Sequence, residues 1–262
     1  HLGVAGVALA SMISQFISAF LILRALLTGK EKYCLRLSEI RFDKRKAVGI
    51  LQIGIPSAFQ YSLFAFANLF VQSSVNSFDH VLVEGNSAAA NADPLVYDMM
   101  AAFYTACSSF IAQNFGARKK KRILQTYLIC LFYSFITSLV LGVGIYLARY
   151  PFLYLFTSDK AVVEAGITRL SIMALSYSAS AFMDASIAAS RGLGKTAVPT
   201  FVVVMGSCVF RIIWIYTIFA YFHTIQSLYI LYVFSWGITA IAENIYFFHV
   251  YRHTLTEKKE LC

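Results

Sequence analysis

The chain has 262 residues, of which 59% are hydrophobic and only 13% are charged. A soluble domain usually carries about twice that charged fraction, so the composition argues against a soluble globular protein. The formal net charge is +9. The basic residues lie between long apolar runs instead of forming a stripe on one folded surface, so we expect no nucleic-acid partner.

Seven apolar runs are long enough to cross a bilayer, which takes about 20 residues. Their approximate bounds are Leu2–Leu23, Ala47–Ser74, Gly85–Asn114, Ile123–Ala148, Val162–Ser190, Val198–Tyr221 and Leu228–Tyr251. The fourth run is apolar nearly all round, whereas a helix of a soluble bundle has a single apolar stripe. The sequence therefore predicts an all-α, polytopic membrane protein with seven transmembrane helices.

Basic residues concentrate in alternate linkers of this arrangement. They occupy residues 24–46, 118–122 and 191–195 and the tail from residue 252 onward, whereas the other linkers hold little beyond Arg149 and Lys160. Lys and Arg accumulate in cytoplasmic loops. We therefore expect a multi-pass protein of the cell's inner (plasma) membrane, surrounded by lipid, with a cytoplasmic C-terminus. Because the chain begins at His1 and enters an apolar run directly, we also expect that an N-terminal part is missing.

The second run carries polar side chains on one helix face. Asn68, Gln72 and Asn76 are spaced by four residues, and Tyr61 lies seven residues before Asn68. Residues four apart are neighbours on a helix surface. This stripe is a candidate lining for a water-accessible cavity, and hydrogen bonds that only hold helices together are an equal alternative.

The third run contains Asn91, Asp93 and Tyr97, and Pro94 directly follows the carboxylate. Proline removes a backbone donor and bends a helix. A carboxylate beside freed carbonyls is a candidate cation or proton site. The alternative is that Asp93 lies close enough to the surface to stay hydrated.

Asp184 lies in the fifth run, with Tyr177 seven residues earlier, and Arg211 lies deep in the sixth. Ionisable groups inside a membrane are costly and usually face a cavity or a partner. Asp184 is therefore a candidate for cation or proton coupling, and the alternative is a salt bridge to Arg211. For Arg211 itself we favour a structural ion pair.

No enzyme signature is present, because the sequence has no phosphate-binding loop, nucleophile elbow or metal-ligand spacing. The five cysteines fit neither a metal site nor a disulfide framework. We expect no catalytic residue, no metal and no cofactor other than a coupling ion. The stretch Gly192–Lys195 predicts a tight turn between helices, with Pro199 near the start of the next helix.

Four stretches resemble the MATE family, the multidrug and toxic compound extrusion transporters. They are Gly-Ile-Pro-Ser at Gly54–Ser57, Ala-Gln-Asn-Phe-Gly-Ala-Arg at Ala112–Arg118, Phe-Met-Asp at Phe182–Asp184 and Arg-Gly-Leu-Gly-Lys-Thr at Arg191–Thr196. The first run, with Val-Ala-Gly-Val-Ala-Leu-Ala, resembles the last helix of the family's N-terminal lobe.

The resemblance implies two six-helix lobes, of which this chain holds the last helix of the first lobe and the whole second lobe. Residues 1–24 would end the N-terminal lobe, 25–46 would link the lobes, 47–252 would form the C-terminal lobe and 253–262 the tail. It further implies efflux of organic cations and drugs in exchange for H⁺ or Na⁺, with the missing N-terminal lobe as partner. Asp184 and Asp93 match acidic positions of the family. Because residues 47–77 contain no acid, an Na⁺ site that some members have there is doubtful.

Two other functions fit part of the pattern. A flippase for lipid-linked precursors, from the same superfamily, should have a more cationic cavity, and we expect only Arg211 at depth in this half. A seven-helix receptor fits the number of spans, but its hallmark motifs are absent.

Overall fold

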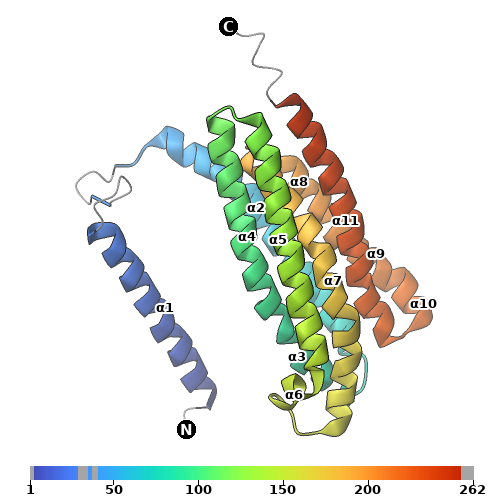
Figure 1. Ribbon diagram of the computed structural model, residues 1–262. Coiled ribbons are helices and arrows are strands. Elements are labelled where there is room, and N and C mark those ends of the chain that lie inside the picture. The colour runs from blue at the N-terminus through green and yellow to red at the C-terminus, as the bar shows by residue number, and fades with distance from the viewer. Residues whose placement is uncertain (1–2, 29–34, 37–40, 255–262) are drawn as a thin grey trace. The chain divides into compact units, whose positions relative to one another are not determined.

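A computed structural model describes residues 3–28, 35–36 and 41–254, and the remaining residues are outside the description (Figure 1). Within the described ranges, seven helical stretches are long and apolar enough to cross a membrane. The predicted all-α fold with seven spans is therefore confirmed. The basic residues Lys30, Lys32, Lys258 and Lys259 of the predicted linker and tail lie outside the described residues.

The chain divides into two compact units, residues 1–51 and 52–262. The first unit contains helix α1 (Gly3–Thr28) and the start of α2 (Lys44–Val75). The stretch Ala8–Thr28 of α1 is long and apolar enough to cross a membrane. The candidate cavity described below lies entirely within the second unit.

The second unit is a bundle of helices that continue from α2. The helices are α3 (His80–Ala90), α4 (Ala92–Gly116), α5 (Lys120–Leu147), α6 (Arg149–Tyr154), α7 (Lys160–Gly192), α8 (Ala197–Val203), α9 (Phe210–Trp214), α10 (Ala220–Phe222) and α11 (Ile225–His253). Two π-helical segments, Val204–Val209 and Ile215–Phe219, join α8, α9 and α10 into one continuous span. The short helix α6 lies in a stretch that the sequence analysis treated as a linker.

Helix α7 is the centre of this bundle and packs against α3, α4, α5 and α11. It is rich in Ala, Ser and Gly. Of the seven spans in the described chain, it has the largest share of its apolar stretch buried inside the protein. Small residues let helix backbones approach closely inside a membrane. Helix α5 packs against α7 and carries the small residues Ser134, Ser138 and Gly142, which recur every four positions and are all buried. Gly142 approaches the backbone of Ala174 on α7.

The third predicted span is broken between α3 and α4 at Asn91. Pro94 has no N–H to bond the carbonyl of Ala90 four residues earlier, which accounts for the interruption at this point. The side chain of Asn91 replaces part of the lost bonding, because its Nδ2 donates to the carbonyls of Ser87 and Ala88, each at 3.1 Å. The break places Asp93 in the first turn of α4, where a negative charge is favoured by the helix dipole.

Three of the predicted basic segments lie at one end of the second unit. The α4–α5 turn, the α7–α8 turn and the end of α11 occupy this end, whereas Arg149 and Lys160 lie at the other (Figure 1). Lys120 Nζ, at the start of α5, donates to the carbonyl of Arg252 at the end of α11 at 2.9 Å. Gly194 supports the tight α7–α8 turn with a φ of 77°, a conformation that glycine adopts without steric cost.

Candidate functional site

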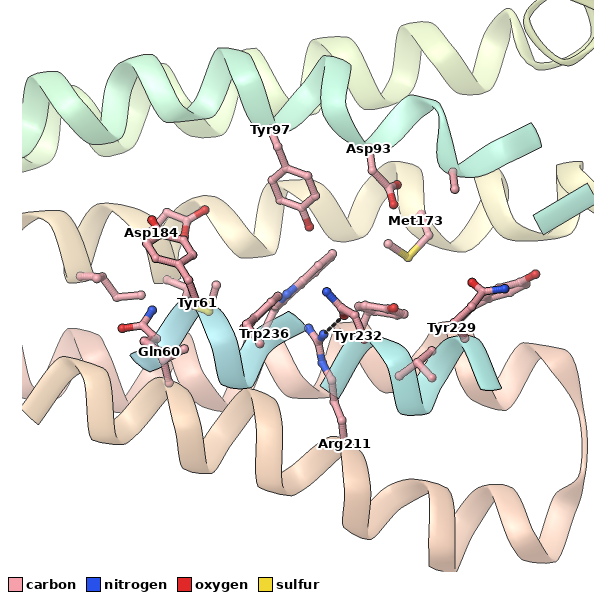
Figure 2. Close-up of a pocket in the computed structure, with 18 of the residues that line it drawn as sticks. Gln60, Tyr61, Asp93, Tyr97, Met173, Asp184, Arg211, Tyr229, Tyr232 and Trp236 are labelled. Atoms are coloured by element: carbon pink, nitrogen blue, oxygen red, sulfur yellow. Dashed lines mark hydrogen bonds between the residues drawn. The ribbon is translucent and has the colours of Figure 1, made fainter. Parts of the chain in front are cut away.

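A cavity of about 510 Å³ lies among helices α2, α3, α4, α7, α8, α9 and α11 (Figure 2). Its ionisable acids and bases are Asp93, Asp184, Arg169, Arg191 and Arg211. Its aromatic side chains are Tyr61, Phe64, Tyr97, Tyr104, Tyr229, Tyr232 and Trp236. Pockets that bind small molecules combine such an apolar, aromatic wall with a few convergent polar groups.

Asp93 forms one side of a buried polar cluster. Arg169 Nη2 lies 2.5 Å from Asp93 Oδ2, and Arg169 Nη1 donates to Asn86 Oδ1 at 2.7 Å. The hydroxyl of Tyr177 donates to the other carboxylate oxygen of Asp93. A buried ion pair stabilises only when further hydrogen bonds satisfy its remaining groups. Asn86 and Tyr177 supply two such bonds here, whereas Arg169 Nε has no partner among the described residues. Asp93 is therefore held by protein partners, while its side chain stays partly exposed.

Arg211 is fully buried on α9, between two aromatic rings. The centroids of Phe64 and Tyr232 lie 4.6 and 4.5 Å from its guanidinium carbon. Its Nη1 donates to Asn68 Oδ1 at 2.8 Å, and its Nε donates to Ser235 Oγ at 3.3 Å. In the described part of the chain it has no acidic partner at ion-pair distance, so the predicted structural ion pair of Arg211 is wrong there.

The backbone around Arg211 is unusual as well. The two π-helical segments flank the five residues of α9 that carry this arginine. Insertions of π-helix shift the side chains that follow them around the helix and occur frequently at functional sites. Hydropathy offers no signal for these segments, since the predicted span is apolar on both sides of Arg211 apart from a few small polar residues such as Ser207 and Thr217.

Asp184 lines the cavity and has no hydrogen-bond partner among the described residues. Arg191 lies seven residues later on the same face of α7, because seven residues are close to two helical turns. Arg191 Nη1 donates to the hydroxyl of Tyr104 at 2.7 Å, and its Nη2 donates to Gln60 Oε1 at 2.8 Å. The alternative salt bridge between Asp184 and Arg211 is therefore not formed.

The other predicted site residues divide into two groups. Tyr61, Asn68, Gln72 and Tyr97 line the cavity. The remaining three are Asn76, Asn91 and Tyr177, which do not belong to its lining. Asn76 follows the end of α2 and accepts a hydrogen bond from Gln72 Nε2 at 2.9 Å. Asn91 is the C-cap of α3. Tyr177 donates a hydrogen bond to the carboxylate of Asp93.

Sequence reasoning missed several residues that line the cavity. Arg169 lies inside the predicted fifth run, so the rule that identified Arg211 would also have identified it. Arg191 was assigned to a cytoplasmic linker, but its guanidinium lines the cavity and donates a hydrogen bond to the hydroxyl of Tyr104. Gln60 lies eight residues before Asn68 and Asn86 lies seven before Asp93, so the helical spacing of the polar residues could have found both. Their long-range partners confirm that they lie at the site.

Fold and cavity together define a multi-pass helical membrane protein with a polar, aromatic chamber between its helices. The family model described as MatE matches residues 56–217. This is more than half of the chain, and the chain therefore belongs to the MATE family, as its sequence motifs predicted.

Two relatives named as multidrug resistance proteins are similar to this chain. "Probable multidrug resistance protein NorM" of Thermotoga maritima is 24% identical over 76% of the chain and 43% of its own length. "Probable multidrug resistance protein YoeA" of Bacillus subtilis is 26% identical over 67% of the chain and 39% of its own length. The chain thus spans less than half the length of these relatives.

Solved structures share the fold. A crystal structure of MATE in the straight conformation superposes on 97% of this chain and 57% of its own with a TM-score of 0.85 and 19% identity. An outward-facing multidrug resistance MATE family transporter of the MOP superfamily covers 96% of the chain and 57% of its own, with a TM-score of 0.84 and 20% identity. A MOP superfamily transporter from Pyrococcus furiosus, whose title reports a binding pocket of reversed polarity, has a TM-score of 0.84 at 19% identity, over 97% of this chain and 58% of its own.

Proposed function

We propose that the protein containing this chain is a secondary active transporter that expels drug-like organic molecules by alternating access. The cavity between the helices is the observation that carries the proposal. Transporter sites of this kind lie near the bilayer midplane, between structural repeats. In this proposal the C-terminal lobe supplies one wall of the pathway, and an N-terminal lobe of the same protein supplies the other.

The membrane side follows from the charge distribution. The basic α4–α5 turn, α7–α8 turn and end of α11 would face the cytoplasm, with the protein in the plasma membrane. This orientation puts Arg191 near the cytoplasmic end of the cavity and the Asp93–Arg169 pair near the outer end.

Asp184 is the proposed coupling residue of the cavity, for exchange with H⁺ or Na⁺. It faces the cavity without a hydrogen-bond donor from the described residues, so its carboxylate is available to a proton or a cation. Asp93 is the second proposed coupling residue. The carboxylate of Asp93 could take up a proton or a cation only after its ion pair with Arg169 and its hydrogen bond from Tyr177 open. Asp93 is therefore suited to a gating step.

Organic cations with flat ring systems are the first proposed substrates. Seven aromatic side chains line the cavity, and a cation over an aromatic face gains about 0.5–2 kcal/mol, most when water is excluded. Asp184 supplies the opposite charge.

A second candidate substrate class carries a negative group, such as the phosphate of a lipid-linked precursor. The sequence analysis expected only Arg211 at depth, but three arginines line the cavity against two aspartates. Asp93 is already matched by Arg169, which leaves Arg211 without an acid among the described residues. The Pyrococcus furiosus transporter described as having reversed pocket polarity gives this candidate a structural parallel.

Efflux of ethidium from cells that express the complete gene tests the proposal. We expect Asp184→Asn to abolish drug resistance and ethidium efflux while its level in the membrane stays at that of the wild type. Asp98→Asn is the matched control, because Asp98 is exposed and does not line the cavity. Equal efflux by the Asp184 variant and the wild type would remove Asp184 from the mechanism.

A further inference from the structure

A second polar cluster lies behind the cavity, where α7, α8 and α11 meet. Glu243 on α11 has no exposed surface, and neither oxygen of its carboxyl group has a hydrogen-bond partner in the described chain. The hydroxyls of Ser190 on α7 and Thr200 on α8 are also buried and without a partner in the same residues. The sequence analysis gave none of these three residues a role.

Helices α7, α8 and α11 pack against one another in this part of the bundle. A single buried cluster includes residues from all three helices, among them Ile187, Val203 and Ala240. Ser190, Thr200 and Glu243 each lie three residues from one of them, toward the end at which α7 turns into α8. Residues three apart share a helix face, so the three polar side chains lie next to this apolar contact, and no hydrogen bond in the described chain joins them.

Arg191 connects this second polar cluster to the cavity. Its two terminal nitrogens donate to Tyr104 and Gln60 on the cavity side, whereas its Nε is buried without a partner from the described residues. Arg191 lines the cavity together with Asp184, and on α7 it directly follows Ser190 of the second polar cluster. One cationic residue of α7 thus borders both the cavity and the cluster that contains Glu243.

The charge state of Glu243 follows from its surroundings. An ionised carboxylate that is removed from water and receives no hydrogen bond is very costly, and such groups become neutral instead. In the observed arrangement Arg191 is committed to Tyr104 and Gln60, and it gives Glu243 no hydrogen bond. The neutral acid is therefore the form that this arrangement of side chains favours.

We propose that Glu243 is a proton-carrying site of the C-terminal lobe, distinct from the cavity acids, and that Arg191 controls its proton by moving between the two. The inference rests on the proposed transport function. A cation that binds at Asp184 would repel Arg191 from the cavity toward Glu243. The carboxyl O–H bond then breaks, the proton passes to water at the α7–α8 end, and the carboxylate pairs with the guanidinium.

Few other charges face Glu243. Tyr246 lies three residues later on the same helix, and α8 contributes the uncharged hydroxyl of Thr200. From α9, Arg211 reaches α11 at Ser235, about two turns away from Glu243. Arg191 is therefore the cation in the described chain that is placed to respond to the proton on Glu243.

The first test uses the protein from the complete gene, purified and reconstituted in lipid vesicles, with ethidium as the probe. We expect Glu243→Gln to lose ethidium uptake driven by a pH gradient while ethidium exchange without a gradient persists. Glu164→Gln is the control, because Glu164 is an exposed carboxylate at the opposite end of α7 and should behave as wild type. Unchanged pH-driven uptake in Glu243→Gln would overturn the proposal.

The second test requires no transport. Infrared spectra of the purified wild-type protein near neutral pH should contain a band of a buried, protonated carboxylic acid. This band should shift in Glu243→Asp and disappear in Glu243→Gln, with Glu164→Gln unchanged. If no such band depends on Glu243, the proton site is refuted whatever the transport result. If the band is present but the wild type moves no ethidium, the site stands and ethidium efflux as the proposed function fails.

Discussion

Gly142 on α5 gives the sharpest structural prediction, because a methyl group at this position meets the backbone of α7. A Cβ added there would lie 2.1 Å from the carbonyl oxygen and 3.0 Å from the carbonyl carbon of Ala174. Non-bonded heavy atoms prefer about 3.5 Å. A backbone carbonyl cannot rotate away as a side chain can, so Gly142→Ala must separate the two helices by roughly 1 Å.

The expected cost is that of overpacking, about 1–3 kcal/mol. Gly144→Ala is a matched control in the same helix, since a Cβ there meets nothing within 4 Å. Both substitutions gain the same helix propensity, about 1 kcal/mol in favour of alanine, so their difference isolates the clash. We expect the melting midpoint of detergent-solubilised Gly142→Ala to fall below that of Gly144→Ala by several degrees. Equal midpoints would refute the close α5–α7 packing.

Three further predictions concern the cavity's polar groups, each measured as the melting midpoint and yield of the purified protein. Asp93→Asn strands Arg169 without its carboxylate and should cost about 3–5 kcal/mol, whereas the double variant Asp93→Leu with Arg169→Met should recover most of the loss. Tyr177→Phe removes the hydroxyl that donates to the carboxylate of Asp93, and it should lower the free energy of unfolding by about 1.5–3 kcal/mol. The same substitution should have no effect in a variant that also lacks the Asp93 carboxylate. Arg211→Lys keeps the charge but loses the planar group that stacks and bonds Asn68, so it should lower the midpoint, and a wild-type midpoint would contradict the described stacking.

The spans were predictable because they rest on local composition. A run of about 20 apolar residues has few alternatives to a membrane helix, and each of the seven predicted runs overlaps one of the seven helical spans. The break in the third span was also indicated, since Pro94 weakens the helix one turn earlier. The ends of the spans were less accurate, as in α7, which starts two residues before and ends two residues after the predicted run.

The pairing of the cavity's charges was not predictable. Asp93 and Arg169 are 76 residues apart and meet only because α4 packs against α7. Arg211 was expected to find an acid, but an amide, a hydroxyl and two aromatic rings surround it instead. Partner choice of this kind depends on helix rotation, which the two π-helical segments change in a way that hydropathy does not record.

The buried state of Glu243 shows the same limit. Glu243 lies close in sequence to the basic tail, yet the structure leaves it no exposed surface. Helix α11 continues to His253, so Glu243 lies about three turns inside its end, and α11 packs against both α7 and α8. Distance along the sequence from a charged tail is therefore a poor measure of depth in a packed bundle.

The most direct test of the account is substrate transport by the protein from the complete gene, purified and reconstituted in lipid vesicles. We predict that an imposed H⁺ or Na⁺ gradient drives ethidium across the membrane, and that Asp184→Asn stops this movement while Asp98→Asn does not. Gradient-driven transport that is equal in the wild type and Asp184→Asn, or a wild type that moves no ethidium under either gradient, would contradict it.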